Sequence, residues 1–591
     1  MLAILVMAPL LLASLLALLL RSYAKQIKYI ALSASILSLI ISIVIYFNQA
    51  TIQNINWFSF SGYSFQITTL TLPLNMLLLF IVAFITPLIF IYSIGFMDTQ
   101  SEQNRYYFEI SLFAASMMLF AISGNFLTMF IAWELLGITS YLLIGFWYKK
   151  ERTSTAARKA ITTILIGDIL MLMGILIILN SYHTLSFSEI LASQPNSSLS
   201  VALLLIMLAA FTKSAQFPFH EWLPDAMEGP TPVSAFLHSS TMVKAGVFLV
   251  AVLLPLYASA NLLNLILIFG LLSAILGALN ALAETHIKRV LAFSTIEDLG
   301  LMFVALGLNS LLAAMLLFFS QTFYKALLFM TAGSIMKANR NEENLNKVYN
   351  SSANKPLFIA NLIGVLSIAG MFPLSGFFGK AAIETLANNV VVYSALLLVE
   401  FISSLYIFRW LLIPTQKSPD AVSYETSLSY KTLPRSMLAP AYVLSAAVVL
   451  GSLSFIYLPS YLSQYKISNL QISSETILIS TSIIVFAALF SYFIYKRKHW
   501  ARLEERSWIL YRILYNTLFM NKLYIYTTKI FAFLSNLVDS LDYSIYQMIK
   551  LSSGGFIAFG NLLKRIETGQ TNTYLIAFVL GVILIVIIFL L

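Results

Sequence analysis

Long apolar runs separated by short polar loops make up most of the chain. A helix that crosses a bilayer needs about 20 apolar residues, and by that measure the pattern predicts about sixteen spans. We therefore predict an all-α polytopic membrane protein. The predicted spans lie near 1–20, 27–47, 72–97, 106–122, 125–148, 158–180, 200–218, 231–256, 262–282, 288–307, 309–336, 357–387, 390–414, 437–460, 475–495 and 572–591.

Two of the apolar segments are interrupted by proline and glycine. The first, Phe211–Gly246, carries Lys213 and then Pro218, and the second, 357–387, carries Lys380 within a Pro- and Gly-containing stretch. The interruptions fall in the seventh and twelfth predicted spans, five spans apart. Broken apolar segments in corresponding places are typical of transporters built from internal repeats. We predict two five-helix repeats, each with a broken helix, and inverted because the number of spans per repeat is odd.

The region after residue 500 has a different pattern, in which charged residues and tyrosines punctuate apolar residues at helical spacing. It predicts a long amphipathic helix over 501–570, lying either along neighbouring subunits or only along the lipid surface, with a break at Gly554-Gly555. The predicted segments are N-terminal spans (1–105), first repeat (106–256), second repeat (257–415), additional spans (416–500), lateral amphipathic helix (501–570) and terminal anchor (571–591).

Composition agrees with the membrane assignment, since 59% of residues are hydrophobic and only 10% are charged. The net charge of +10 does not indicate a nucleic-acid partner, because the basic residues gather in short loops beside the spans. Among lysines and arginines, the predicted external loops contain only Lys466. Because basic residues gather on the cytoplasmic side, the sixteen spans place both termini outside. Met1–Leu20 is predicted to be a first span and not a removed signal peptide. With no cysteine and no Gly-rich nucleotide motif, no cofactor or metal is predicted in this chain.

An ionisable side chain inside a span is costly, and it marks an ion or proton path by default. We predict that Glu134 and Lys213 form a pair. Burial favours the neutral form of such groups and an opposite charge favours the charged form, so breaking the pair would release a proton. Lys380 is the same kind of site in the second interruption. The alternatives are a structural ion pair that never titrates, and lysines that reach the membrane surface from helix ends.

Further charged residues lie between the two interruptions. His238 and Lys325 are candidate relay groups, although a lone histidine is often only a satisfied core residue. Asp168 either tunes the Glu134–Lys213 pair or makes a local polar contact. The adjacent acids Glu297 and Asp298 form either a cation-attracting pair or part of a water-filled cytoplasmic access. Lys244, Lys288 and Arg289 lie nearer to predicted span ends, where topology alone accounts for the last two.

Several runs in fixed order carry a family resemblance. The chain contains AWELLG, TKSAQFPFHEWLPDAMEGPTPVSAFLHSSTMVKAGVFL, KRVLAFSTIEDLGLMF, FYKALLFMTAGSI and FPLSGFFGK. Over roughly 70–480 it resembles the antiporter-like subunits of respiratory complex I, and its length and last segments resemble the distal, L-type member. Mrp-type antiporter subunits share the core motifs. The resemblance implies proton-transfer residues Glu134, Lys213, His238, Lys325 and Lys380, and a supporting polar axis of Asp168, Lys244, Lys288, Gln321 and Glu384.

The sequence departs from that family pattern at three places. Many relatives carry histidines where this chain has Leu317 and Gln321, and glutamine holds water but does not accept and pass on a proton. An acid that often follows the terminal lysine is replaced by Ala381, with Glu384 one turn further on as a substitute. The position in span 6 that is often arginine is Leu165.

The resemblance implies a proton-translocating, antiporter-like membrane subunit of a complex I-type quinone oxidoreductase in a prokaryotic plasma membrane. Flavin, iron–sulfur clusters and quinone would lie in partner subunits, contacted along 501–570. The other partners would be the bilayer and protons. The alternatives are a subunit of a Mrp-type Na⁺/H⁺ antiporter or of a membrane-bound hydrogenase, and a non-conducting scaffold, which the changes at Leu317 and Gln321 favour.

Overall fold

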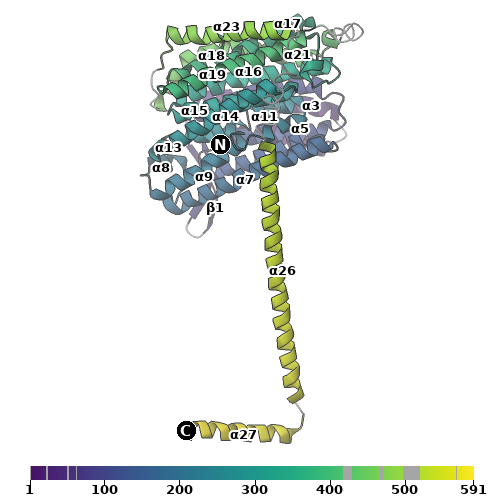
Figure 1. Ribbon diagram of the computed structural model, residues 1–591, viewed down its shortest axis with the longest axis vertical. Helices are drawn as coiled ribbons and strands as arrows, with labels where there is room; N and C mark the ends of the chain where they lie inside the picture. The colour runs from purple at the N-terminus through teal and green to yellow at the C-terminus, as the bar shows by residue number, and fades with distance from the viewer. Residues whose placement is uncertain are drawn as a thin grey trace. The chain divides into compact units, whose positions relative to one another are not determined.

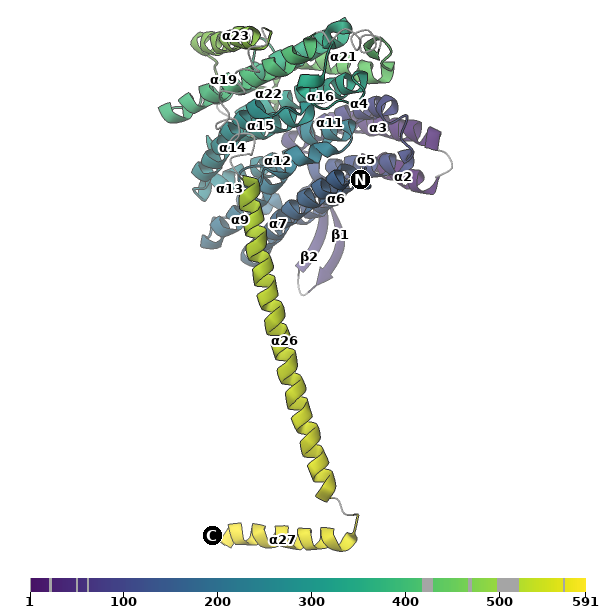
Figure 2. The same ribbon diagram turned by 45° about the vertical axis from the view of Figure 1, so that its right-hand side comes forward.

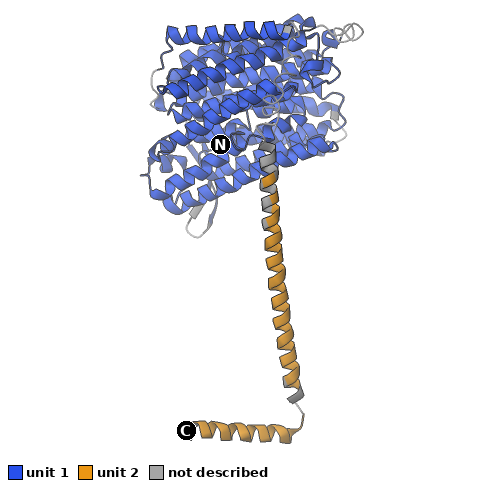
Figure 3. Cartoon of the chain, in the orientation of Figure 1, with its two compact units in different colours: residues 1–515 blue, residues 516–591 orange. Residues whose placement is uncertain are grey.

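The computed structural model divides into two compact units, Met1–Tyr515 and Asn516–Leu591 (Figure 3). The first unit is a helical bundle, and the second consists of two helices. The residues that the structure describes are 2–20, 24–48, 52–60, 63–416, 429–465, 470–496, 520–566 and 569–590. Lys466 and the predicted helical segment 501–519 lie outside these ranges.

Most predicted spans coincide with helices of the first unit. Twelve helices among the described residues of both units are long and apolar enough to cross a membrane. The remaining predicted spans coincide with helices that are shorter or more polar, namely α2, α5, α9 and α17. The bounds are α1 (Leu2–Leu5), α2 (Ala8–Leu19), α3 (Ala24–Phe47), α4 (Pro73–Phe96), α5 (Gln103–Ala121), α6 (Phe126–Ile144), α7 (Glu151–Tyr182), α8 (Phe187–Ala192), α14 (Leu263–Ala283), α15 (Ile287–Gly307), α16 (Leu311–Ala338), α19 (Val390–Leu412), α21 (Arg435–Leu450), α22 (Ser454–Tyr461) and α23 (Ser474–Lys496).

One predicted loop contains β-structure, so the all-α prediction is wrong there. The strands β1 (Ile52–Phe60) and β2 (Tyr63–Leu70) pair antiparallel, with Ile55 opposite Ile67. The amide of Leu70 donates to the carbonyl of Ile122 at 2.7 Å, which ties β2 to the α5–α6 connection. Both strands are rich in β-branched and aromatic residues, which fit a pleated ribbon.

Both predicted interruptions are present. In the first, α9 (Ser197–Lys213) ends before a loop with a cis Phe217-Pro218 peptide, and α10 (Trp222–Asp225) follows. In the second, α17 (Lys355–Ala369) and α18 (Ser375–Glu384) flank a cis Phe372-Pro373 peptide. The Pro- and Gly-containing stretches therefore separate helices, as predicted.

The predicted span 231–256 coincides with the apolar stretch Thr231–Val252, one of the twelve that could cross a membrane. Its helix is not continuous, because it is divided into α11 (Thr231–Ser239), α12 (Lys244–Val252) and α13 (Leu254–Ser259). The hydroxyl of Thr241 donates to the carbonyl of Phe236 at 2.7 Å, between α11 and α12. Such side-chain hydrogen bonds compete with the helical backbone pattern, which explains why the hydropathy pattern alone overlooked the division.

Helices α14, α15 and α16 lie side by side in the first unit (Figures 1 and 2). Glycines allow α14 and α15 to approach closely, since a Cβ at Gly300 would lie 2.6 Å from the backbone oxygen of Gly270. Small residues at such contacts are the usual means of packing membrane helices. In the most apolar 18-residue stretch of α15, 100% of the residues are buried, and in that of α16 the share is 94%. Charged side chains in the centres of these helices therefore face protein and not lipid.

In the second unit, α26 (Met520–Ile566) is followed by α27 (Thr571–Leu590), which matches the predicted anchor. The predicted break at Gly554-Gly555 is wrong, because α26 continues through both glycines. A glycine inside a helix costs only about 1 kcal/mol relative to alanine, which is too little to end a long helix. The apolar side chains of Leu541 and Met548 are exposed within this unit.

The contact between α14 and α15 predicts the effect of Gly300→Ala. Alanine favours a helix over glycine, but here its methyl group would collide with backbone of α14. We expect a loss of about 1–3 kcal/mol, the usual range for overpacking, measured as a lower unfolding temperature of the purified complex. Gly581→Ala in α27 is the matched control, because nothing lies within 4 Å of the position that its Cβ would take. A Gly300→Ala protein as stable as the control would refute the close contact.

Candidate functional site

Lys213 is fully buried at the end of α9, where it contacts α6 and α7. Its Nζ donates to the carbonyl of Trp133 at 2.6 Å and lies 4.2 Å from the centroid of the Trp133 ring. It also lies 4.0 Å from Oδ1 of Asp168, which accepts a hydrogen bond from Trp133 Nε1 at 2.7 Å. The indole thus orients the carboxylate that faces the lysine.

The predicted partner Glu134 is half-buried on α6. Among the described residues, Asp168 and not Glu134 lies within ion-pair distance of Lys213. The charges of Asp168 and Lys213 still act on Glu134. Gly137, one turn further along α6, lies against the lysine, since a Cβ there would be 3.8 Å from Lys213 Nζ. Asp168 thus lies beside Lys213. Its tuning of a Glu134–Lys213 pair, and the pair itself, stay predictions.

The adjacent acids of α15 contact two different lysines. Oδ2 of Asp298 lies 3.1 Å from Nζ of Lys325, and Oε1 of Glu297 lies 3.7 Å from Nζ of Lys380. Successive helical residues point about 100° apart, so one helix reaches both α16 and α18. All four side chains are at most 4% exposed. Of the two readings left open for these acids, their contacts with the lysine ammonium groups favour the cation-attracting pair.

Hydrogen bonds complete the surroundings of the two lysines. Nζ of Lys325 donates to the hydroxyl of Ser294 at 2.5 Å. Nζ of Lys380 donates to the carbonyl of Ile368 at 2.7 Å and to the hydroxyl of Ser403 at 3.1 Å. Ile368 lies in the last turn of α17, where carbonyl groups lack helical partners. The interruption of the helix therefore supplies an acceptor for Lys380.

Three further predicted residues lie beside α16 or on it. Nζ of Lys244 donates to the hydroxyl of Thr322, one turn before Lys325. His238 and Gln321 are fully buried, and neither the ring nitrogens of His238 nor the amide atoms of Gln321 have a hydrogen-bond partner among the described residues. The His238 ring centroid lies 6.2 Å from that of Phe329 on α16. The three residues share this buried layer with the lysine–acid pairs.

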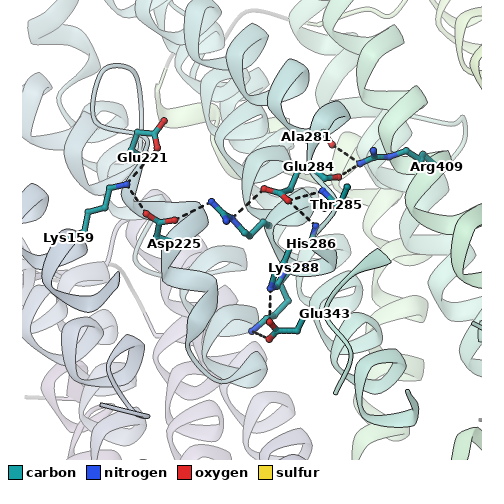
Figure 4. A network of polar contacts seen from close by, with 11 residues as sticks. Lys159, Glu221, Asp225, Ala281, Glu284, Thr285, His286, Lys288, Glu343 and Arg409 are labelled. Atoms are coloured by element: carbon teal, nitrogen blue, oxygen red, sulfur yellow. Dashed lines mark hydrogen bonds and ion pairs between the residues drawn. The ribbon is translucent and has the colours of Figure 1, made fainter. Parts of the chain in front are cut away.

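A polar network connects the first interruption to the start of α15 (Figure 4). Lys159 on α7 lies 2.7 Å from Asp225, which lies 3.2 Å from Arg289 on α15. Arg289 lies 3.4 Å from Glu284 in the α14–α15 connection. These pairs hold the loop after α9 between the helices of the two predicted repeats.

Lys288 is buried and joins this network, and its place on the supporting polar axis stays a prediction. It donates to the carbonyls of Met227 and Gly229, the latter at 3.1 Å, and lies about 13 Å along α15 from Glu297. Glu343, in the loop after α16, lies 4.0 Å from Lys288 and bonds to His286 at 3.0 Å. Burial opposes ionisation of Glu343, but the hydrogen bond from His286 and the charge of Lys288 hold the pKa of its carboxyl below the ordinary value.

Sequence reasoning overlooked three buried charges inside predicted spans. Glu109 pairs with Arg105 at 2.7 Å. Arg409 donates to the carbonyls of Ala281 and Glu284. Glu400 lies near Lys380 and is 3% exposed. Each interrupts an apolar run, so the rule that selected Glu134 would have found all three. No group of three or more metal-ligating side chains capable of holding an ion occurs in the part of the chain that the structure describes.

Two family models match the chain. The family described as NADH:quinone oxidoreductase/Mrp antiporter, TM matches residues 123–406. The family described as NADH-Ubiquinone oxidoreductase (complex I), chain 5 N-terminus matches residues 57–107. The first match contains all the predicted proton-transfer residues.

Individual relatives extend the similarity beyond those matches. The chain is 31% identical to F(420)H(2) dehydrogenase subunit L of Methanosarcina mazei, over 90% of this chain and 89% of the relative. It is 32% identical to NADH-quinone oxidoreductase subunit L of Campylobacter jejuni subsp. jejuni, over 79% and 78% of the two chains. A Mrp complex structure from Dietzia sp. has the same fold, with a TM-score of 0.72 at 21% identity, covering 100% of this chain and 63% of that longer one. The chain therefore belongs to the antiporter-like transmembrane subunits of the NADH:quinone oxidoreductase and Mrp antiporter family.

Proposed function

We propose that this chain carries protons across the membrane as an antiporter-like subunit of a complex I-type quinone oxidoreductase. The observation that carries the proposal is the contact of Asp298 and Glu297, neighbours on α15, with Lys325 and Lys380. These contacts form a continuous row of buried charges from the centre of the bundle to the second interruption. A scaffold has no need of such a row, because each buried charge is costly.

The row suggests how a proton advances. An ammonium group beside a carboxylate stays charged, and the same group without that partner favours the neutral amine. Separation of Lys325 from Asp298 would leave uncompensated charges that are unfavourable by several kcal/mol. If Lys325 then gives its proton to a neighbouring water, an N–H bond breaks, an O–H bond forms, and the lysine no longer carries an unpaired buried charge. Because Glu297 adjoins Asp298, a change at one pair alters the field at the other.

We also propose that 106–256 and 257–415 are inverted repeats with one half-channel each. Lys213 and Lys380 share the same kind of surroundings, since each donates to a backbone carbonyl and faces a carboxylate. They differ in position, because Lys213 ends the helix before its interruption, whereas Lys380 lies in the helix after it. Glu134 and Asp168 would load the first half-channel, with His238 and Lys244 between Lys213 and Lys325.

The redox chemistry would take place in partner subunits that carry flavin, iron–sulfur clusters and quinone. The apolar side chains exposed along α26 support contacts with neighbouring membrane subunits over 501–570. The basic loops favour a plasma-membrane orientation with both termini outside.

A Mrp-type antiporter or hydrogenase subunit is the second candidate, favoured by the fold shared with the Mrp complex. Co-purification of quinone-site and iron–sulfur proteins would favour the first candidate.

The first half-channel predicts that Lys213→Ala and Glu134→Ala each reduce proton pumping while the complex still assembles. Pumping is measured as acidification of vesicles that contain the purified complex, relative to quinone reduction in the presence of an uncoupler. Lys347→Ala, in an exposed loop position, is the matched control and should pump normally. Normal pumping by both Lys213→Ala and Glu134→Ala would rule out their assigned roles.

The Lys325–Asp298 pair predicts a separation of stability from pumping. Lys325→Met or Asp298→Leu alone leaves one buried charge unpaired, which destabilises a protein by about 3–5 kcal/mol. The double variant removes both charges and should recover most of the lost stability, since apolar replacements of a whole buried pair are often neutral. Proton pumping should be abolished in the double variant as in the single variants. The measurements are the thermal unfolding of the complex and vesicle acidification, and a double variant that pumps normally would support the scaffold alternative.

A further inference from the structure

A small cavity beside Lys380 is lined by two acids. Its volume is about 10 Å³, near the lower limit for one water molecule. Glu384 is the last residue of α18 and lies one turn after Lys380, and Glu400 lies on α19. The lining residues are Leu301, Lys380, Ile383, Glu384, Leu396 and Glu400.

Both carboxylates are buried, and that of Glu400 is incompletely satisfied. Glu384 is 5% exposed and its Oε2 accepts a hydrogen bond from the hydroxyl of Ser480 at 3.0 Å. Glu400 is 3% exposed, and its Oε2 has no hydrogen-bond partner among the described residues. A buried polar atom without a partner is unfavourable, and an ionised carboxylate only accepts hydrogen bonds. A shared proton or a bridging water would satisfy both groups.

The second interruption brings Glu400 and Lys380 to the same place. A Cβ at Gly370 would lie 3.5 Å from Oε1 of Glu400 and 3.5 Å from Cδ of Lys380. Gly370 has φ of 89°, a conformation that favours glycine. The glycine that ends α17 therefore also leaves the space in which the acid of α19 and the lysine of α18 meet.

We propose that Glu384 and Glu400 form a paired-acid site that accepts the proton released by Lys380, an inference that rests on the proposed function. In this step the N–H bond of the Lys380 ammonium breaks and an O–H bond forms on one carboxylate, directly or through one water. The products are a neutral amine and a carboxylic acid that shares its proton with the second carboxylate. The pair takes the role of the acid that often follows the terminal lysine in relatives, where this chain has Ala381.

The location of the pair is suited to the last transfer of the row. The nearest ion pair of Lys380 is with Glu297 at 3.7 Å, on the side of the central axis. Glu384 and Glu400 line the cavity together with Lys380, and Glu384 directly precedes the loop between α18 and α19. A proton that reaches Glu384 is thus at the end of a helix, next to residues 385–389.

The test replaces each acid by its neutral isostere. Glu384→Gln and Glu400→Gln should each lower the rate of vesicle acidification by at least about tenfold, since positioned proton-transfer groups contribute about 10²–10⁴-fold to rates. Uncoupled quinone reduction should be retained, and Glu400→Asp should restore part of the pumping. Glu475→Gln is the matched control, because Glu475 is an exposed acid in the first turn of α23. A second readout is the carboxylic C=O infrared band, which should shift in D₂O and be lost in Glu400→Gln.

Lys380→Ala, measured in parallel, separates the two proposals. Normal pumping in Glu400→Gln together with loss in Lys380→Ala overturns the paired acids and leaves the proposed function standing. Normal pumping in Lys380→Ala overturns the proposed function itself. If Glu400→Gln fails to assemble, the infrared spectrum of the unsubstituted complex and of Glu400→Asp decides. A deuterium-sensitive carboxylic band in both supports the pair, and its absence from both overturns it.

Discussion

The need to neutralise charges inside a low-dielectric bundle constrains this structure more than any other interaction. Asp298 and Glu297 meet that need for two lysines at once, and so fix the positions of α16 and α18 relative to α15. Rotation of α15 about its axis would leave all four charges without partners, which is unfavourable by several kcal/mol for each. The arrangement that stabilises the centre of the bundle is therefore also the one that a moving proton must disturb.

Helix packing and helix interruption both serve these charges. Glycines between α14 and α15 let the two backbones meet, so α14 covers one side of the helix that carries the acids. The interruption after α17 exposes the carbonyl of Ile368, and the negative end of the helix dipole favours a cation there. Neither feature bears charge itself. Together they explain why a lysine is tolerated at position 380.

Hydropathy located nearly all the helices because the bilayer fixes the length of an apolar span. Proline and glycine located the interruptions, but glycine alone misled at Gly554-Gly555, because α26 continues through both residues and contains no proline. The partners of the buried charges were harder to predict. Lys213 faces Asp168, 45 residues before it, because of how α6, α7 and α9 are rotated against one another. An apolar run gives the existence of a helix and not its rotation about its axis.

The departures from the family pattern at Leu317 and Gln321 acquire a physical meaning from their positions. A Cβ at Gly379 would lie 2.7 Å from Cα of Leu317, so α16 and α18 nearly touch just before Lys380. Gln321 lies one turn before Lys325 with both amide atoms buried and unpartnered among the described residues. Buried polar atoms without protein partners are usually satisfied by water. A route from Lys244 to Lys325 would therefore pass through water held at Gln321, and the loss of a histidine there does not by itself make the chain a scaffold.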